Sequence, residues 1–286
     1  MKENENCQQQ IEEQVKEIER LTKEKQNLQQ KDELHKQNKE KHKQDIKRAL
    51  EILIQMNHPA INQIFTYSLS EQPFSGVLSI TMISQFESNG SFDDIMKNIQ
   101  KGINNANWNS TKKMITIFGI AVALLYIHRS RLIYRNLKPS NILFDENFEP
   151  HLADFNFSRL SSNDDDTEDS ETTEKISLYT APELFENSPC NNKVDVYSYG
   201  SVLYSIFMNK EPDFEMDDQE AIKASIIIGS RPSLSSDLIP SSYQTLISQC
   251  WGNTSSDRPS FKSIVRQLST PEFLLPDVDI DLFIQY

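Results

Sequence analysis

Five polar residues in one short stretch of the chain could do chemistry together. The segment LIYRNLKPSNILFDE covers residues 132–146 and runs on into NFEPHLADFNF, and these residues include Arg135, Asn136, Lys138, Asn141 and Asp154. Two of the five side chains are cations, two are neutral amides and one is a carboxylate. A neutral amide cannot act as a base at any ordinary pH, so Asn136 cannot take a proton from a reactant.

The composition predicts a soluble globular protein whose main part is acidic. The chain has 286 residues, and a hydrophobic content of 37% is enough for a packed core. Residues 51–286 carry 17 Lys and Arg against 31 Asp and Glu, which disfavours a nucleic acid as partner. The three cysteines and five histidines are too scattered for a disulfide framework or a zinc site.

No membrane segment is expected. The longest apolar stretch, residues 114–127, is shorter than the roughly 18 to 20 residues that span a bilayer, and it therefore predicts a buried helix. The N-terminal residues MKENENCQQQ lack the apolar core of a signal sequence. Together with the cysteine usage, these features favour the cytoplasm.

The N-terminal part of the chain is typical of a long polar helix. Residues 1–58 contain no Gly, Pro, Phe, Trp or Tyr and are rich in Glu, Gln and Lys. Apolar residues recur at intervals of three, four and seven at Ile11, Val15, Ile18, Leu21 and Leu28. Pairing as a coiled coil over residues 8–30 is one interpretation, and a solvated single helix is the other.

A continuous apolar helix face follows, and then a hairpin. Ile46, Leu50, Leu53 and Ile54 fall on one helix face, and Asn57, His58 and Pro59 are expected to end the helix. Residues 61–69 and 77–84 have strand composition, and the intervening segment contains the turn residues Pro73 and Gly76.

The rest of the chain is expected to be mainly helical. The predicted helices cover residues 91–102, 111–130, 193–208, 217–227, 240–250 and 259–268. The segment between Leu160 and Ser177 holds seven acids and almost no apolar residue, which predicts a surface loop. Its Ser and Thr residues are alternatively candidates for phosphorylation.

Five ordered motifs resemble those of the protein kinase family, most closely its tyrosine-kinase-like Ser/Thr branch. YRNLKPSN at 134–141 is similar to the catalytic loop, DFN at 154–156 to the magnesium-binding motif and APE at 181–183 to the end of the activation segment. DVYSYG at 195–200 and DRPSF at 257–261 are similar to two motifs of the large lobe. The resemblance covers about residues 43–270 and is far more specific than any single motif.

The resemblance implies a role for each of these residues in phosphoryl transfer, in which the protein mainly positions groups and neutralises charge. Asp154 and Asn141 would hold magnesium, Lys138 would lie near the transferred phosphate, and Asn136 stands at the position of the catalytic aspartate. Gln85, Glu87 and Leu143 would contact the adenine of ATP. Two further contacts would maintain the fold: Asp195 would hold the backbone of the catalytic loop, and Glu183 would pair with Arg258.

The departures from the family pattern concern catalysis. The aspartate that accepts the substrate proton is replaced by Asn136, a loss typically worth about 10² to 10⁴ in rate. The first glycine of the chain is Gly76, so the glycine-rich loop over the nucleotide is missing, and the segment at 8–26 that should supply a strand lysine has helix composition. Ala49 stands where the glutamate partner of that lysine belongs, and Asn156 replaces the glycine of the magnesium motif.

The sequence therefore predicts an α+β, protein-kinase-like fold with a reduced small lobe. The expected parts are a polar helical extension (1–45), a small lobe of one helix and one hairpin (46–90), a mainly helical large lobe (91–275) and a tail (276–286). The interpretation is a pseudokinase that acts as a scaffold or regulator, with other proteins such as signalling kinases or their substrates as partners and a homodimer through residues 8–30. ATP and Mg²⁺ would be cofactors only if residual binding exists.

Three alternatives remain open at this point. In the first, the chain is an active Ser/Thr kinase that recruits a lysine from elsewhere, which Lys138, Asn141 and Asp154 support. In the second, the chain lacks its true first strands. In the third, the coiled-coil segment is the functional part and the kinase-like lobe is its cargo.

Overall fold

The computed structural model describes residues 2–71, 78–103, 105–161, 178–185, 190–214, 216 and 218–286. The turn residues Pro73 and Gly76 and most of the predicted acidic loop lie outside the described residues. The chain divides into two compact units, Met1–Lys47 and Arg48–Tyr286.

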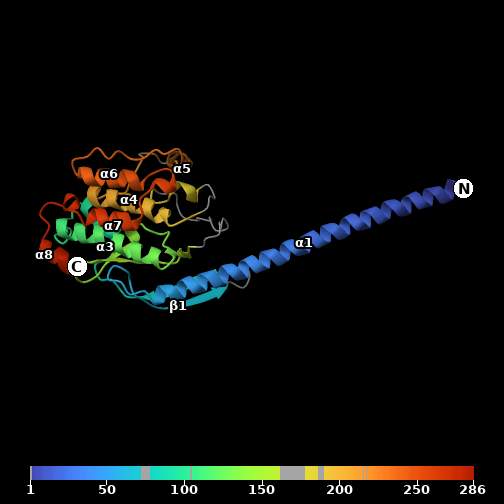
Figure 1. Cartoon of the computed structure of the whole chain (residues 1–286), viewed down its shortest axis with the longest axis horizontal. Coiled ribbons are helices and arrows are strands. Elements are labelled where there is room, and N and C mark those ends of the chain that lie inside the picture. Colours follow the sequence, from blue (N-terminus) through green and yellow to red (C-terminus); the bar gives the residue numbers. More distant parts are fainter. Residues whose placement is uncertain are drawn as a thin grey trace. The chain divides into compact units, whose positions relative to one another are not determined.

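The first unit consists of helix. It forms most of α1, a helix that runs over 53 residues from Lys2 to Ile54 (Figure 1) and is about 80 Å long at 1.5 Å per residue. Three leucines of this unit point into solvent: Leu21 is 51% exposed, and Leu28 and Leu34 are each 58% exposed, whereas Ile46 near the end of the unit is buried. The helix ends three residues before the predicted stop, because Gln55 and Met56 form tight turns back to Ile52 and Leu53.

The second unit begins with the last turns of α1 and a hairpin. Ala49, Leu50 and Leu53 are buried, as an apolar helix face predicts. The strands β1 (Ile64–Glu71) and β2 (Leu78–Ser84) pair antiparallel and, in the described part of the chain, form a two-stranded sheet. β1 begins at Ile64, later than the predicted residue 61. The reason is that the backbone N–H of Asn62 donates to the carbonyl of Leu152, so the chain before β1 pairs with a different strand.

A helical lobe forms the larger part of this unit. Helix α3 packs against α7, α4 and α8, and α4 packs against α6 (Figure 1). The helices are α2 (Phe92–Gln100), α3 (Ser110–Arg129), α4 (Lys193–Met208), α5 (Gln219–Ile227), α6 (Ser241–Cys250), α7 (Phe261–Leu268) and α8 (Ile280–Gln285). Their N-termini follow from capping residues in several cases: Ser91 and Asp94 form a capping box at α2, and Asn109 caps α3.

Helix α3 is long and strongly apolar. By length and composition alone it could cross a membrane, but 61% of its most apolar window is buried inside the protein. Ile115, Ile117 and Leu124 are fully covered. The helix thus has the burial of a core helix, and this is the arrangement predicted for residues 111–130.

Two short antiparallel strand pairs bring the polar residues between Arg135 and Asp154 together. Strand β3 (Leu132–Ile133) pairs with β6 (Arg159–Leu160), and β4 (Ile142–Phe144) pairs with β5 (Pro150–Leu152), both antiparallel. In the part of the chain that the structure describes, four single turns of 3₁₀ helix complete the elements: η1 (Pro139–Asn141), η2 (Pro182–Leu184), η3 (Ser255–Asp257) and η4 (Pro271–Phe273). The catalytic-loop residues lie between β3 and β4, and Asp154 follows β5.

The C-terminal residues form an element that the sequence did not indicate. The segment 276–286 was expected to be a tail, but it contains α8, whose Phe283 packs edge-on against Phe118 of α3 with ring centroids 5.6 Å apart. The backbone N–H of Asp279 donates to the hydroxyl of Thr111 at 2.9 Å. These contacts with α3 are tertiary. Because α8 has only six residues, its sequence shows no helical pattern of apolar residues that could have predicted it.

Candidate functional site

A buried aspartate anchors the catalytic-loop segment. Asp195 of α4 is fully buried, and its Oδ1 accepts the backbone N–H of Arg135 at 2.7 Å. Its Oδ2 accepts the N–H of Tyr134 at 2.9 Å and lies 2.8 Å from Nε2 of His128. The predicted task of Asp195, holding the backbone of this loop, is confirmed.

Two residues of the site have left-handed backbone. Arg135 has φ 65° and Asp154 has φ 50°, a conformation that costs energy for residues other than glycine and persists where the surroundings enforce it. The rings of Tyr134 and Phe155 pack with centroids 5.0 Å apart, and the Tyr134 hydroxyl donates to the carbonyl of Ala153. Burial raises the pKa of Tyr134 well above its usual value, so this hydroxyl stays a donor.

Asn136 joins the loop to Asp154. The Asn136 side chain is buried, and its Nδ2 donates to Oδ2 of Asp154 at 2.9 Å and to the Asp154 carbonyl at 3.2 Å. Asn141 in turn donates its Nδ2 to the backbone carbonyl of Asn136 at 2.8 Å. Three of the predicted site residues are therefore in direct contact.

Asn156 completes this group. Its Nδ2 donates to Oδ1 of Asp154 at 2.7 Å, and its backbone N–H lies 3.4 Å from the same oxygen. The residue stood out in the sequence as a replacement for glycine, but its contact with Asp154 was not foreseen. Each oxygen of the Asp154 carboxylate thus accepts a hydrogen bond from a side-chain amide.

The residues predicted to contact adenine are partly engaged within the protein. The carboxylate of Glu87 is buried and lies 2.6 Å from Nδ1 of His151. Gln85 donates its N–H to the carbonyl of Gln63 at 2.9 Å, and its own carbonyl accepts Nδ2 of Asn62 at 3.2 Å. Leu143 lies on β4 and is half-buried.

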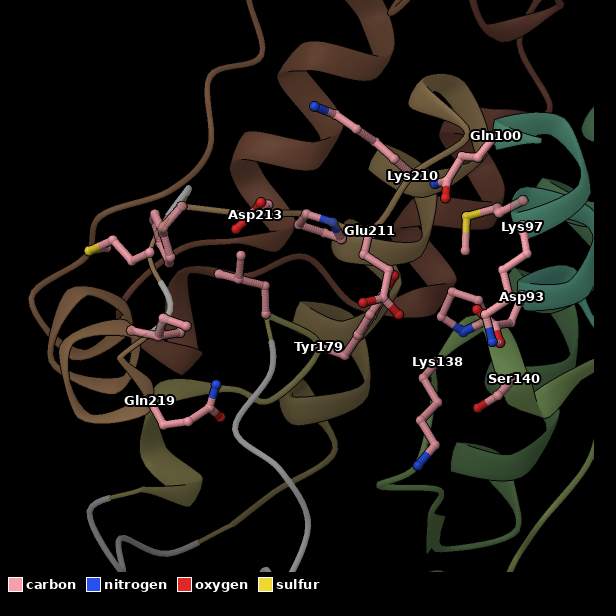
Figure 2. A pocket seen from close by; sticks show the side chains of 17 residues that line it. Asp93, Lys97, Gln100, Lys138, Ser140, Tyr179, Lys210, Glu211, Asp213 and Gln219 are labelled. Atoms are coloured by element: carbon pink, nitrogen blue, oxygen red, sulfur yellow. Dashed lines mark hydrogen bonds and ion pairs between the residues drawn. The ribbon is translucent and has the colours of Figure 1, made fainter. Parts of the chain in front are cut away.

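Lys138 lies at a cavity beside this group. The cavity has a volume of about 860 Å³, and neither Asn136 nor Asp154 is among the residues that line it. Figure 2 shows Asp93, Lys97 and Gln100 of α2 along one side, with Lys138 and Ser140 below them. Asp213 of the loop after α4 and Gln219 at the start of α5 lie on the opposite side in this view, with Tyr179 and Glu211 between the two sides. The lining also includes Lys210, Pro212, Phe214, Met216 and Ile222.

The cavity combines both signs of charge with apolar surface. Asp93 and Lys97 form an ion pair at 2.5 Å on α2, and the Tyr179 hydroxyl lies 2.8 Å from the hydroxyl of Ser205. Met96, Leu178 and Phe214 contribute apolar atoms to the lining. The volume of this cavity lies in the range that is usual for ligand-binding clefts.

The donor set around Asp154 does not fit a divalent cation in this arrangement. Mg²⁺ requires near-octahedral oxygen ligands at about 2.0–2.1 Å, but the Asp154 oxygens face the N–H groups of Asn136 and Asn156. Among the described residues, no group of three or more His, Cys, Asp and Glu side chains could hold a metal ion.

A buried ion pair fixes the end of the activation-segment motif. Arg258 is 1% exposed, and its two terminal nitrogens donate to the two carboxylate oxygens of Glu183 at 2.7 and 2.8 Å. Such a bidentate pair is strong and geometrically specific. The predicted pairing of Glu183 with Arg258 is confirmed.

Comparison with known proteins agrees with the motifs. Residues 7–268 match the family described as protein tyrosine and serine/threonine kinase. A mimivirus protein named as a serine/threonine-protein kinase/receptor is 31% identical over 194 residues, which cover 66% of this chain and 11% of that protein. A Dictyostelium discoideum protein named as a serine/threonine-protein kinase is 29% identical over 229 residues, which cover 79% of this chain and 16% of the relative.

A serine/threonine-protein kinase of Arabidopsis thaliana is 30% identical over 195 residues, which cover 66% of this chain and 31% of that kinase. The chain thus spans between about a tenth and a third of the length of these relatives. The family match itself covers far more than half of the 286 residues. The chain belongs to the protein tyrosine and serine/threonine kinase family.

Proposed function

We propose that the chain is a pseudokinase that works by binding other proteins and does not transfer phosphate. One observation carries the proposal. The group at the position of the proton acceptor, Asn136, is an amide whose Nδ2 donates to Asp154, so it faces the site as a donor. A general base must accept a proton from the attacking hydroxyl, and neither the chemistry nor the orientation of this amide allows that.

The nucleotide side of the site supports the same proposal. Ala49 is buried where an active kinase has a glutamate paired with a lysine, and alanine offers no partner for an ammonium group. The carbonyl of Gln85 already accepts the Asn62 amide. We propose that the small lobe consists of the last turns of α1 and the β1–β2 hairpin, which leaves ATP with too few contacts for binding at cellular concentrations.

A phosphate-transfer assay tests the proposal. The full chain is incubated with radiolabelled ATP, Mg²⁺ and a general Ser/Thr substrate, beside an Asp154→Ala variant as matched control. We expect both proteins to give the background measured without protein, in the substrate and in the chain itself. Transfer by the wild type that disappears in the variant would instead establish the second candidate, an active Ser/Thr kinase with an unusual lysine.

That second candidate is favoured by one observation. Asn136, Asn141 and Asp154 are in contact as a working site would require, and Lys138 is close by in sequence. The same assay therefore separates the two candidates.

The cavity beside Lys138 is the proposed site for a partner protein. Its two sides come from α2 and from the loop after α4 (Figure 2), and its lining is both charged and apolar. We propose that an extended segment of the partner binds here, with other kinases or their substrates as the partner class. A Met216→Glu change should abolish partner binding, because it places a charge on an exposed apolar part of the lining, whereas binding that survives would place the partner elsewhere.

The N-terminal helix is the proposed site of self-association. Leu21 and Leu28 are seven residues apart and more than half exposed in the single chain, which suits the seam of a coiled coil over residues 8–30. Cys7 lies at the same heptad position as both leucines. A parallel, in-register dimer would therefore bring the Cys7 residues of two copies together.

Sedimentation velocity and oxidative cross-linking test the dimer. We expect the wild type to sediment as a dimer and to form a Cys7 cross-link, and a Leu21→Ser/Leu28→Ser variant to do neither. A Lys23→Ser/Gln30→Ser variant, changed at two exposed positions with the same spacing, should behave like the wild type. A wild type that remains a monomer as its concentration rises would contradict the dimer.

A further inference from the structure

We propose that Asn136 and Asn156 form an amide clamp on Asp154 that replaces a bound cation, so that this part of the fold keeps its shape without any divalent metal. The clamp consists of two side-chain amides on two different oxygens. Asn136 Nδ2 lies 2.9 Å from Oδ2, and Asn156 Nδ2 lies 2.7 Å from Oδ1. The inference goes beyond the proposed binding role, because it assigns a structural task to these two asparagines.

The clamp also stabilises the strained backbone of Asp154. This residue has φ 50°, and the same Asn136 amide that contacts its carboxylate donates to its backbone carbonyl at 3.2 Å. One donor group therefore fixes the side chain and the main chain of a single left-handed residue. Hydrogen bonds to a carboxylate are about twice as strong as those between neutral groups.

The position of the Asn136 amide is itself fixed. The residue is 5% exposed, and its backbone carbonyl accepts the Nδ2 of Asn141 at 2.8 Å. A buried amide of this kind cannot turn to solvent when its acceptor is removed. Its N–H groups would remain without partners, and buried unpaired donors are costly.

A cation at Asp154 would have to displace this arrangement. The N–H hydrogens carry partial positive charge and point at the same carboxylate lone pairs that a metal ion would use. Binding would therefore oppose like charges or turn the amides away. Asn136 and Asn156 occupy two positions at which the sequence departs from the kinase pattern, and both departures act on one carboxylate.

A single substitution should turn the clamp into a cation-dependent site. In Asn136→Asp, a carboxylate faces the Asp154 oxygen at 2.9 Å and the Asp154 carbonyl at 3.2 Å, and it can donate to neither. A divalent cation between the two carboxylates would relieve the repulsion. The matched control is Asn107→Asp, which adds the same charge at an exposed position.

The first measurement is thermal unfolding of the full chain in millimolar MgCl₂ and in NaCl of the same ionic strength. We expect the wild type and Asn107→Asp to have equal Tm values in the two solutions. For Asn136→Asp we expect a Tm about 4 to 8 °C lower in NaCl, with at least half of the loss recovered in MgCl₂. Two results would overturn the proposal. In one, the Tm of the wild type rises in MgCl₂ as much as that of Asn136→Asp. In the other, Asn136→Asp is as stable as the wild type in NaCl and its Tm does not respond to Mg²⁺.

A second variant keeps the test decisive if Asn136→Asp does not fold. Asn156→Ala removes the 2.7 Å partner of Oδ1 from an exposed residue, so it should fold and free one oxygen for a cation. With Mn²⁺ as the probe, we expect paramagnetic broadening of the amide resonances of residues 153–157 in Asn156→Ala and none in the wild type. Equal broadening in both proteins would show that the amides exclude no cation. Both readouts are independent of phosphate transfer, so their failure is distinct from failure of the proposed function.

Discussion

Replacement of Asp195 by asparagine probes the contact that holds the site together. The side chain is fully buried, and its two oxygens accept the backbone N–H groups of Tyr134 and Arg135 at 2.9 and 2.7 Å. Asparagine has the same shape, but one of its terminal atoms is an NH₂ group. In either orientation of the amide, that donor faces a backbone N–H donor. The variant therefore cannot satisfy both backbone groups.

The magnitude follows from these contacts. A buried backbone N–H without an acceptor costs about 1–3 kcal/mol, and the remaining hydrogen bonds lose the assistance of a negative charge. Together these effects predict a loss of about 3–5 kcal/mol in the free energy of unfolding, in line with the loss of one partner from a buried charged contact. For a domain of this size that is a fall in Tm of about 6 to 20 °C.

Chemical denaturation and hydrogen exchange measure the effect globally and locally. The control is Asp237→Asn, which removes the same charge from an exposed position and should change the stability by about 0.5 kcal/mol or less. In Asp195→Asn we also expect faster exchange of the Tyr134 and Arg135 amides. If Asp195→Asn stays within about 1 kcal/mol of the wild type and both amides remain protected, the Asp195 carboxylate does not hold this loop in the way described.

Three further predictions concern stability. Glu183→Gln should cost about 3–5 kcal/mol in urea denaturation, because it leaves the Arg258 guanidinium buried at 1% exposure without its ion partner; a loss near zero would contradict this. Burial lowers the pKa of His58 below 6.5, and its Nδ1 accepts the Ala60 N–H. Protonation of His58 therefore favours the unfolded state. The contribution of His58 to the free energy of unfolding is complete above pH 6.5 and is lost as the pH falls below that value. A His58→Gln variant should lack this dependence of stability on pH. Tyr286→Phe should leave Tm unchanged or raise it, because the buried hydroxyl it removes has no hydrogen-bond partner in the described structure, and a clear fall in Tm would argue for a missed contact.

Contacts tied to motif positions could be predicted from the sequence. Asp195 and Glu183 contribute to the fold through partners that recur at fixed places in the kinase pattern, so their roles followed once the motifs were identified. Helix α4, Lys193–Met208, was predicted with the bounds that the structure has. A helix of this length can be predicted from the sequence because many of its residues contribute to the same pattern of apolar positions.

Contacts that depend on side-chain direction could not be predicted. Asn156 was seen as a tolerable replacement for glycine, but the direction of its amide is set by the left-handed backbone at Asp154. The pairing of Glu87 with His151 joins residues 64 positions apart that share no motif, and it uses a side chain that the sequence had suggested for nucleotide binding. Such features emerge only when the fold brings separate segments into contact.

Titration of the full chain with ATP in the presence of Mg²⁺ shows whether this kinase-like chain binds nucleotide. A nucleotide at about 100 times its Kd would stabilise the native state by about 2.7 kcal/mol, which corresponds to a rise in Tm of about 5 to 10 °C. We expect a change of less than about 1 °C at millimolar ATP with Mg²⁺, the same as for Asp154→Ala, because the proposed small lobe offers the phosphates too few contacts and both oxygens of the Asp154 carboxylate accept amide N–H groups. A saturable rise in Tm that requires Mg²⁺ and disappears in Asp154→Ala would contradict the account.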